Sequence, residues 1–312
     1  MTMNGEVNPA PAMSEPDSAA TRRQNVPRGI VKIDIRARVD PHSVVDDRIG
    51  LLGDTHGNFP WTRDALYRFL GVGIRQIHVL GDFGFIWHGG PREHKLLGRL
   101  DEILAKRDGR LFVTGGNHEG YAALERQFPP DELGYRHLSE HITFLPRGWR
   151  GRTRTGTVIA SLGGANSIDR WWRKPPRADG HGGSWWPQES ITEADLKALG
   201  TARVHVLLGH EAPRSRELDK NINERRSGLK HWELAYAAES QRMFQRAVEQ
   251  VRPRLTVSGH HHVWINTVES HQSSAGEEFK TQSVMLNRDG TDEALATLEV
   301  DRFDLRLLVQ RQ

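Results

Sequence analysis

The 312-residue sequence contains no cysteine. This absence excludes a disulfide scaffold, a thiol nucleophile, a cysteine-ligated zinc site and an iron–sulfur cluster, because each of them needs a thiol. Any metal ion must therefore be held by histidine and by oxygen ligands. The chain carries 16 histidines, which makes such a site the first possibility to test.

Long apolar runs are also missing. No stretch approaches the roughly 20 consecutive apolar residues that a membrane-spanning helix needs. The first 20 residues lack a basic segment followed by an apolar one, which is the pattern of a secretory signal. We therefore expect a cytoplasmic protein without a membrane partner. Lysine and arginine total 43 against 40 acidic residues, and the resulting net charge of +3 does not by itself indicate a nucleic-acid partner.

The N-terminal residues have little to bury. Residues 1–27 are rich in proline, alanine, serine and asparagine, which predicts a disordered N-terminal tail. Apolar and polar residues then alternate over 31–39, which predicts a strand with one wet face. We expect the folded domain to occupy residues 28–312, with its structure beginning near Gly29. This length suits one large α/β domain with insertions or two small domains.

Short apolar runs alternate with helical patterns along the rest of the chain. Helical patterns cover residues 61–70, 93–106 and 233–251. Alternation of strands and helices indicates a sheet that is covered on both faces. Consecutive strand patterns lie near the C-terminus, at residues 283–286, 294–300 and 303–309. The fold class expected is α/β with a mixed sheet.

Five apolar runs share one ending, a glycine followed by residues that commonly bind metal ions. The five junctions are Gly53-Asp54-Thr55-His56, Gly81-Asp82, Gly116-Asn117-His118, Gly209-His210 and Gly259-His260-His261-His262. In α/β sheets, ligands bind at the carboxyl ends of the strands, and glycine allows a sharp turn and a close approach to an ion. We therefore expect the five strand ends to converge on one place.

The number of candidate ligands indicates more than one ion. We expect His261 to point away from its two neighbours, and without it the junctions offer two carboxylates, one asparagine carbonyl and four histidines in addition to His118. This set is too large for one tetrahedral zinc ion, and it suits two ions that share a bridging carboxylate. The spacing of two residues, as in Asp54 and His56, lets both side chains face one ion where the chain is extended.

Between residues 49 and 264 the ordered series of junctions resembles the calcineurin-like metallophosphoesterase family, in its bacterial and phage-type members. The resemblance implies a two-sheet mixed β-sandwich flanked by helices. It also implies one metal site formed by Asp54, His56 and His262, and a second formed by Asn117, His210 and His260. Asp82 would bridge the two ions, and His118 would lie beside them, over the phosphate, without binding metal. The resemblance thus makes catalytic candidates of His118, Asp82 and Asn117.

The family chemistry is hydrolysis of a phosphomonoester or phosphodiester. Two ions roughly 3.5–4 Å apart lower the pKa of a bridging water, and the resulting hydroxide attacks phosphorus in line. His118 would stabilise the developing charge or protonate the leaving oxygen, a contribution of about 10²–10⁴-fold. Manganese, iron or zinc fits ligation by histidine and carboxylate. The expected substrates are a phosphorylated small molecule, a nucleotide or a phosphoprotein.

After Asp82 the sequence departs from the Ser/Thr protein phosphatase branch of the family. In that branch the motif continues to an aspartate that orients the catalytic histidine and to an arginine that grips phosphate. This sequence has Phe83-Gly84-Phe85-Ile86-Trp87-His88 instead. The orienting group and the phosphate clamp must come from elsewhere, which counts against a protein phosphatase. His88 is close enough to Asp82 along the chain to be a candidate substrate-binding residue.

A segment rich in tryptophan and arginine spans about residues 147–190. Residues 147–177 include eight basic residues and a single acidic one, Asp169. The segment resembles an insertion that lies beside the metals in bacterial and phage-type members, and we expect Arg170 or Arg173 to reach the substrate phosphate. Bases can stack on tryptophan in a cationic groove, but tryptophans also pack long loops onto a domain. Both interpretations stay open here.

Two alternative functions follow. The first is a nuclease or nucleotide phosphodiesterase acting on nucleic acid, for which a salt-dependent affinity for single strands that is lost in Trp172→Ala would be diagnostic. The second is a non-catalytic protein-binding scaffold of the same fold. A scaffold does not need His118 and a full ligand set, and this sequence has both. The sequence leaves the oligomeric state open.

Overall fold

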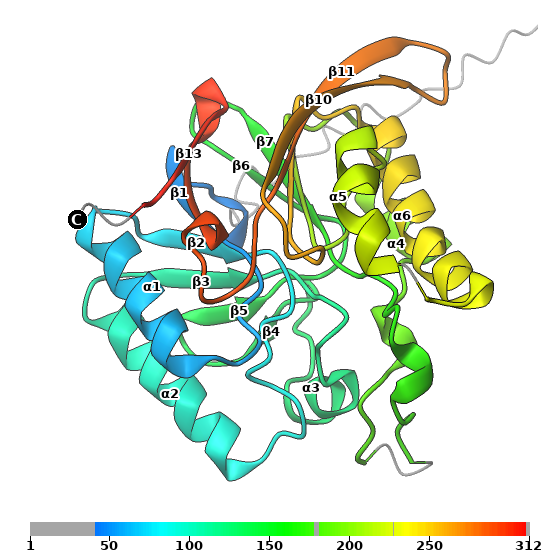
Figure 1. Ribbon diagram of the computed structural model, residues 1–312. Helices are drawn as coiled ribbons and strands as arrows, with labels where there is room; N and C mark the ends of the chain where they lie inside the picture. The colour runs from blue at the N-terminus through cyan, green and yellow to red at the C-terminus, as the bar shows by residue number, and fades with distance from the viewer. Residues whose placement is uncertain (1–40, 178–180, 227, 310–312) are drawn as a thin grey trace, which may run out of the picture. The chain divides into compact units, whose positions relative to one another are not determined.

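The computed structural model describes residues 41–177, 181–226 and 228–309 (Figure 1). The expected tail at 1–27 and the expected strand at 31–39 lie outside these residues. In the described part of the chain the strands form two mixed sheets, with seven strands in one and six in the other. The predicted α/β sandwich with flanking helices is thereby confirmed.

The seven-stranded sheet has the strand order β13-β12-β1-β2-β3-β5-β4. Its strands are β1 (Arg48–Leu52), β2 (Gln76–Val79), β3 (Arg110–Val113), β4 (Arg136–His137), β5 (Ile142–Phe144), β12 (Leu295–Glu299) and β13 (Asp304–Leu307). Strands β1, β2, β3 and β5 are parallel, whereas β4, β12 and β13 pair with their neighbours in the antiparallel sense.

The six-stranded sheet has the order β10-β11-β9-β8-β7-β6. Its strands are β6 (Trp149–Arg152), β7 (Val158–Leu162), β8 (Val206–Gly209), β9 (Leu255–Ser258), β10 (Ile265–Gln272) and β11 (Glu278–Met285). The central strands β7, β8, β9 and β11 are parallel, and β6 and β10 are antiparallel edge strands. The C-terminal strand patterns of the sequence correspond to β11, β12 and β13, so the prediction of a mixed sheet is confirmed.

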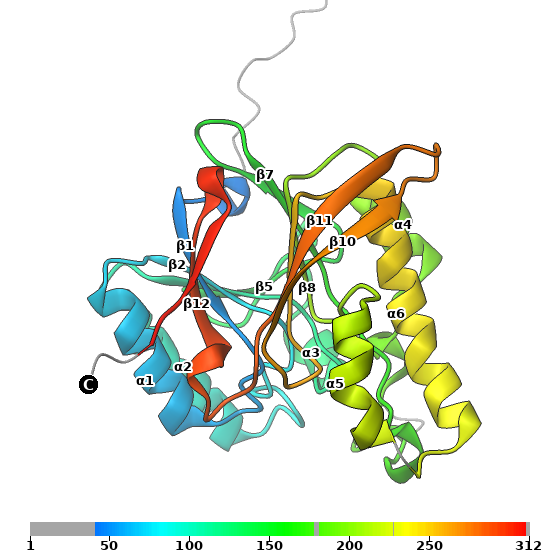
Figure 2. The ribbon, with the colours of Figure 1, turned by 45° about the horizontal axis from the view of Figure 1, so that its top comes forward.

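Helices cover the outer face of each sheet (Figure 2). The helices on the seven-stranded sheet are α1 (Phe59–Gly71), α2 (Pro91–Ala105) and α3 (Tyr121–Gln127). Those on the six-stranded sheet are α4 (Glu193–Leu199), α5 (Arg216–Arg226) and α6 (His231–Val251). The three predicted helical segments correspond to α1, α2 and α6. No helix within the described ranges is long and apolar enough to cross a membrane.

Three apolar layers hold this arrangement together. Ile49 and Leu51 of β1 pack between the two sheets with Val257 of β9, and all three are fully buried. On the outer faces, Phe69 of α1 packs on one sheet and Phe244 of α6 on the other. Parallel strands buried on both faces are expected to be almost continuously apolar, and this explains the short apolar runs in the sequence.

The packing of the sheets places five strand ends at one edge. Strands β1, β2 and β3 are neighbours in one sheet, and β8 and β9 are neighbours in the other. Because the parallel strands of each sheet end on the same side, the loops that follow these five strands meet across the sandwich (Figures 1 and 2). The candidate ligands lie in these loops.

Candidate metal centre

The first group of candidate ligands comes from the loops after β1 and β9. Asp54, His56 and His262 each present a ligand atom, and these atoms lie within 4.8 Å of one another. His262 Nε2 is 3.1 Å and His56 Nε2 is 4.0 Å from Asp54 Oδ2. Asp54 is fully buried, whereas both histidines are partly exposed. The structure therefore brings together the three residues that the family resemblance assigns to one ion.

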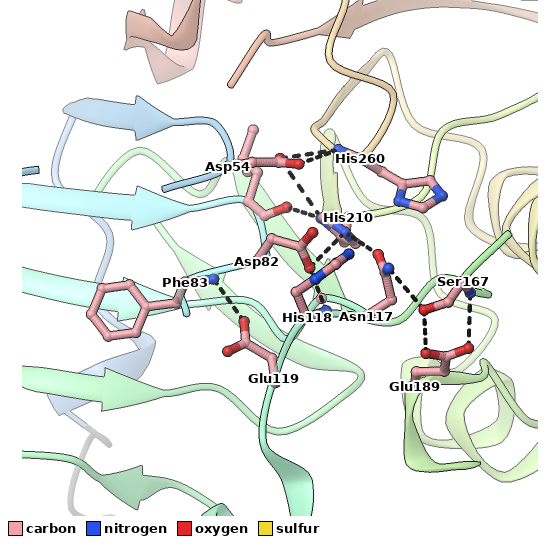
Figure 3. A network of polar contacts seen from close by, with 12 residues as sticks. Asp54, Asp82, Phe83, Asn117, His118, Glu119, Ser167, Glu189, His210 and His260 are labelled. Carbon is pink, nitrogen blue, oxygen red and sulfur yellow. Dashed lines mark hydrogen bonds and ion pairs between the residues drawn. The ribbon is translucent and has the colours of Figure 1, made fainter. Parts of the chain in front are cut away.

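The second group comes from the loops after β3, β8 and β9 (Figure 3). His210 Nε2 lies 2.8 Å from Asn117 Oδ1, and the ring of His210 has its centroid 4.9 Å from that of His260. His210 Nδ1 lies 2.8 Å from the carbonyl oxygen of Leu80. Because a carbonyl only accepts, Nδ1 donates this bond, so Nε2 is the ring nitrogen that faces the other candidate ligands.

Asp82 lies between the two groups. Its Oδ1 is 3.1 Å from His210 Nε2, and its Oδ2 is 3.6 Å from His56 Nε2. The backbone N–H of His118 also donates to Oδ1, at 2.7 Å. The side chain is buried, and Asp82 lies three residues after the end of β2. One carboxylate thus turns an oxygen toward each group, which is the arrangement that a bridging ligand requires.

The backbone at the candidate ligands adopts conformations that side-chain-bearing residues rarely take. Only seven non-glycine residues have positive φ in the part of the chain that the structure describes. Four of them are candidate ligands: His56 (46°), Asp82 (49°), His260 (68°) and His262 (53°). Such conformations cost roughly 1–3 kcal/mol each and concentrate at functional sites.

Two of the junction glycines make room for ligands from other loops. A Cβ on Gly81 would lie 2.2 Å from His210 Nδ1, and one on Gly259 would lie 2.2 Å from Asp54 Oδ1. Any side chain at these positions would therefore displace a candidate ligand. These two glycines keep the strand ends close enough for their side chains to meet.

The electrostatics of the site favour bound positive charge. Burial lowers the pKa of His210, but the neighbouring charges of Asp82 and Asp54 raise it to about 10. Burial also opposes protonation of His56, and the contact with Asp82 together with the charge of Asp54 raises its pKa to about 9. The carboxylates therefore stabilise a cation at this position. Two carboxylates, an amide oxygen and four imidazoles are suitable ligands for first-row transition metal ions.

Two carboxylates beside the ligands were not identified from the sequence. Asp289, which follows β11, has Oδ1 3.0 Å from His56 Nδ1 and accepts a bond from Asn58 Nδ2 on its other oxygen. Glu211 has Oε1 2.9 Å from His261 Nε2. No sequence pattern marks Asp289, whereas Glu211 directly follows His210 and is adjacent to a junction.

His118 lies at the edge of the ligand groups. Its ring is stacked on that of Trp87, with centroids 6.1 Å apart, and Arg173 Nη2 lies 3.2 Å from its Nδ1. Burial lowers the pKa of His118; the charge of Asp82 raises it, and that of Arg173 lowers it further. The neutral imidazole of His118 is therefore favoured, and it accepts a hydrogen bond from Arg173.

The structure separates the two arginines predicted to reach the phosphate. Arg173 is held by Asp169, whose carboxylate is 2.9 Å from Arg173 Nε, and its side chain is only 8% exposed. It therefore reaches His118 from the insertion. The guanidinium of Arg170 instead lies over aromatic rings, 4.2 Å from the centroid of Trp185 and 4.6 Å from that of Tyr236.

His88 lies away from the ligands. It is exposed, and its backbone N–H donates to Glu93 at the start of α2. Its side chain lines a cavity with Arg126 and Arg177, whereas Asp82 lines a different one. Trp87 lies between the two, because it lines the His88 cavity and also stacks on His118.

The first half of the insertion packs against the domain. Arg147 donates to the carbonyl oxygen of Ser190 at 2.5 Å and to the Asp195 carboxylate at 3.0 Å. Arg150 donates to the carbonyl oxygen of Leu199 at 2.9 Å. Trp149 is buried between the sheets. Much of the positive charge in the sequence of this segment thus serves internal hydrogen bonds.

A buried network connects the insertion to Asn117 (Figure 3). Asn117 Nδ2 donates to Ser167 Oγ at 3.0 Å, and Ser167 Oγ donates to Glu189 at 2.5 Å. The Glu189 carboxylate also accepts from Trp185 Nε1 and the Tyr236 hydroxyl, at 2.8 and 2.9 Å. Burial raises the pKa of Glu189, and these donors oppose that shift.

The candidate ligands open into a cavity of about 360 Å³. Its polar lining residues include Asp82, Asn117, His118, His260 and His262. Apolar residues of the insertion and of the α5–α6 region also line it, namely Ile168, Ile222, Leu229 and Ala237. The cavity therefore offers both polar and apolar contacts to a ligand.

Comparison with known proteins identifies the family. The model of the calcineurin-like phosphoesterase family matches residues 47–264, more than half of the chain, and the protein belongs to this family. No curated protein matches the chain. Among solved structures, TT1561 of Thermus thermophilus is 14% identical with a TM-score of 0.44, and the match covers 84% of this chain and 99% of TT1561. A dimetal phosphatase from Danio rerio is 12% identical with a TM-score of 0.38, and the match covers 80% of this chain and 91% of that phosphatase.

Proposed function

We propose that the protein is a phosphoesterase with a dinuclear metal centre that hydrolyses a phosphomonoester or a phosphodiester. The observation that carries this proposal is the position of Asp82, whose two oxygens face two separate groups of ligands. A carboxylate in this position can be shared by two ions. The match to a family of phosphoesterases supports the same reaction class.

The residues would divide between the two ions as the family resemblance implies. Asp54, His56 and His262 would hold one ion, and the residues that hold the other would be Asn117, His210 and His260. When bound, two ions supply Lewis acidity that activates water and neutralises charge on the phosphate. Manganese, iron or zinc suits this donor set, with histidine and oxygen ligands.

Arg173 and Asp169 supply the clamp that is missing after Asp82. Arg173 Nη2 contacts His118, and the Nε atom of the same guanidinium lies 2.9 Å from the Asp169 carboxylate. A phosphate oxygen entering the cavity would compete with the imidazole of His118 for this guanidinium. Pairing with phosphate would also reduce the effect of Arg173 on the pKa of His118. The imidazole could then take up a proton and deliver it to the leaving oxygen.

The test uses two synthetic esters. Nitrophenyl phosphate and bis-nitrophenyl phosphate are incubated with protein that has been stripped of metal and with protein reloaded with Mn²⁺. We expect turnover of at least one ester by the reloaded protein only, and none by Asp82→Asn. The preferred ester distinguishes a monoesterase from a diesterase. Two bound metal ions without turnover of either ester would contradict the proposal and favour a scaffold.

A further inference from the structure

Three tryptophans of the protein lie at the surface beside the candidate metal centre. Trp171 is 50%, Trp172 is 80% and Trp232 is 41% exposed. Trp171 and Trp172 belong to the 3-10 turn Arg170–Trp172, and Trp232 lies in the first turn of α6. The rings of Trp171 and Trp232 meet edge to face, with centroids 4.2 Å apart. We call these three residues the tryptophan rim.

The exposure of the rim contrasts with that of Trp149 and Trp186, two other tryptophans of the insertion. Trp186 is 1% exposed and packs in the core beside Trp87, and Trp149 is 4% exposed between the sheets. Tryptophans that serve to anchor a loop are buried in this way. Trp172 leaves most of a large apolar side chain in water, and groups of exposed apolar side chains commonly mark interaction sites.

Positive charge surrounds the rim. The guanidinium carbon of Arg170 lies 4.9 Å from the ring centroid of Trp171, and Lys230 Nζ lies 5.4 Å from that of Trp232. Lys174, two residues after Trp172, is exposed. The nearby acid Asp169 is paired with Arg173. The rim therefore combines flat aromatic surfaces with cations, which suits a ligand that has both flat rings and negative charge.

The rim adjoins the cavity of the metal centre through both of its segments. Ile168 and Asp169 line the cavity directly before the turn that carries Trp171 and Trp172. Leu229 and Ala237 line it on either side of Trp232 in the sequence. A chain that placed one phosphate at the metal centre would thus pass over the rim as it left the cavity.

We propose that the tryptophan rim binds the bases of single-stranded nucleic acid whose backbone enters the cavity. Stacking of bases on aromatic side chains, with cations along the phosphates, is the general mode of single-strand binding. Bases in a duplex are stacked on each other and are not available to the rim. A nucleic-acid strand matches both features at once, because its bases can stack on the rings while its phosphates meet the cations beside the rim. This inference rests on the proposed function only for the cleavage of the strand, not for its binding.

The test measures binding without turnover. The metal-loaded full-length protein is titrated into a fluorescein-labelled, phosphorothioate-linked thymidine 20-mer, and anisotropy is recorded at several salt concentrations. We expect saturable binding that weakens as salt increases, and weaker binding of the same sequence as a duplex. Trp172→Ala should weaken binding of the single strand about tenfold, which corresponds to the loss of one stacked base.

Tyr67→Ala is the matched control. Tyr67 lies on α1, on the other sheet, and is 53% exposed, so this variant also removes an exposed aromatic ring. Its affinity for the single strand should equal that of the wild type. The inference is overturned if the wild type does not bind the strand, if Trp172→Ala binds as the wild type does, or if both variants lose affinity equally. Binding of the strand by a protein that hydrolyses neither nitrophenyl ester would overturn the proposed function instead.

Discussion

Asn117 donates through Nδ2 to Ser167 Oγ, at 3.0 Å, while its Oδ1 faces His210 Nε2 at 2.8 Å. An amide can turn by half a rotation and exchange its oxygen and nitrogen. Ser167 prevents this exchange because its hydroxyl proton is already donated to Glu189 and its oxygen remains free to accept. The carbonyl oxygen of Asn117 is thereby kept toward the candidate ligands.

Ser167→Ala should weaken the binding of one metal ion. Without the hydroxyl, the buried Nδ2 of Asn117 loses its acceptor, and the orientation of the amide is no longer fixed. Loss of such an outer contact typically reduces metal affinity about 10–100-fold. Titration calorimetry with Mn²⁺ should show one weakened site and one unchanged. Ser190→Ala, in the same segment but without a contact to a candidate ligand, is the control, and equal affinities in all three proteins would refute the assignment.

Asp289→Ala should weaken the binding of the other metal ion. Asp289 Oδ1 lies 3.0 Å from His56 Nδ1 and so directs His56 Nε2 toward Asp54 and Asp82. We expect a loss of about 10–100-fold at the site that contains His56, measured by metal analysis after dialysis at graded Mn²⁺ concentrations. Asp292→Ala removes a half-exposed carboxylate three residues away and should bind as the wild type does. A loss at both sites in Asp289→Ala would argue against two separable ions.

His118→Ala should retain both ions and lose turnover. His118 lies beside the ligand groups and contacts Arg173, so its removal leaves all seven candidate ligands in place. The expected loss in kcat is about 10²–10⁴-fold, the usual contribution of a general acid, with metal content unchanged. His94→Ala changes an exposed histidine on α2 and serves as the control. Wild-type turnover in His118→Ala would show that the catalytic role assigned to it is wrong.

Gly81→Ala should be more destabilising than Gly73→Ala. Both glycines have positive φ, 100° and 86°, so both substitutions impose the strain of that conformation, about 1–2 kcal/mol. A Cβ at Gly73 meets open space, whereas one at Gly81 would lie 2.2 Å from His210 Nδ1. The clash should add about 1–3 kcal/mol. Urea unfolding of the two variants measures the difference, and equal losses would show that the loop relaxes without cost.

His78 should make the protein sensitive to mild acid. It is fully buried in β2, and burial lowers its pKa to about 3, against about 6.5 in the unfolded chain. Between these values the unfolded state binds the extra proton, so stability is present above pH 6.5 and declines as the pH falls. From pH 7 to pH 5 the wild type should lose about 2 kcal/mol more than His78→Leu.

Urea unfolding at the two pH values measures this double difference. The other titrating groups are common to both proteins, so their contributions cancel. His94→Leu, at an exposed position, should lose as much stability as the wild type. If His78→Leu and the wild type lost the same stability between the two pH values, His78 would be able to take up its proton while the protein stays folded.

The sequence by itself determined many of the elements and predicted the candidate ligands. Apolar runs that end in glycine and a candidate ligand predicted β1, β2, β3, β8 and β9 and the convergence of their ends, because short continuous apolar runs encode buried parallel strands locally. The helical patterns located α1, α2 and α6 to within a few residues. The family follows from the same motifs, since their order along the chain carries the information.

Only the tertiary structure decided which residues support those ligands. Asp289 lies 233 residues from His56 in the sequence and 50 residues separate Ser167 from Asn117, so no local pattern links either pair. The structure also placed Arg173 at His118 and Arg170 on aromatic rings, although both lie in one basic segment. Contacts of this kind depend on how the two sheets and the insertion pack together, which is a property of the whole fold rather than of any segment.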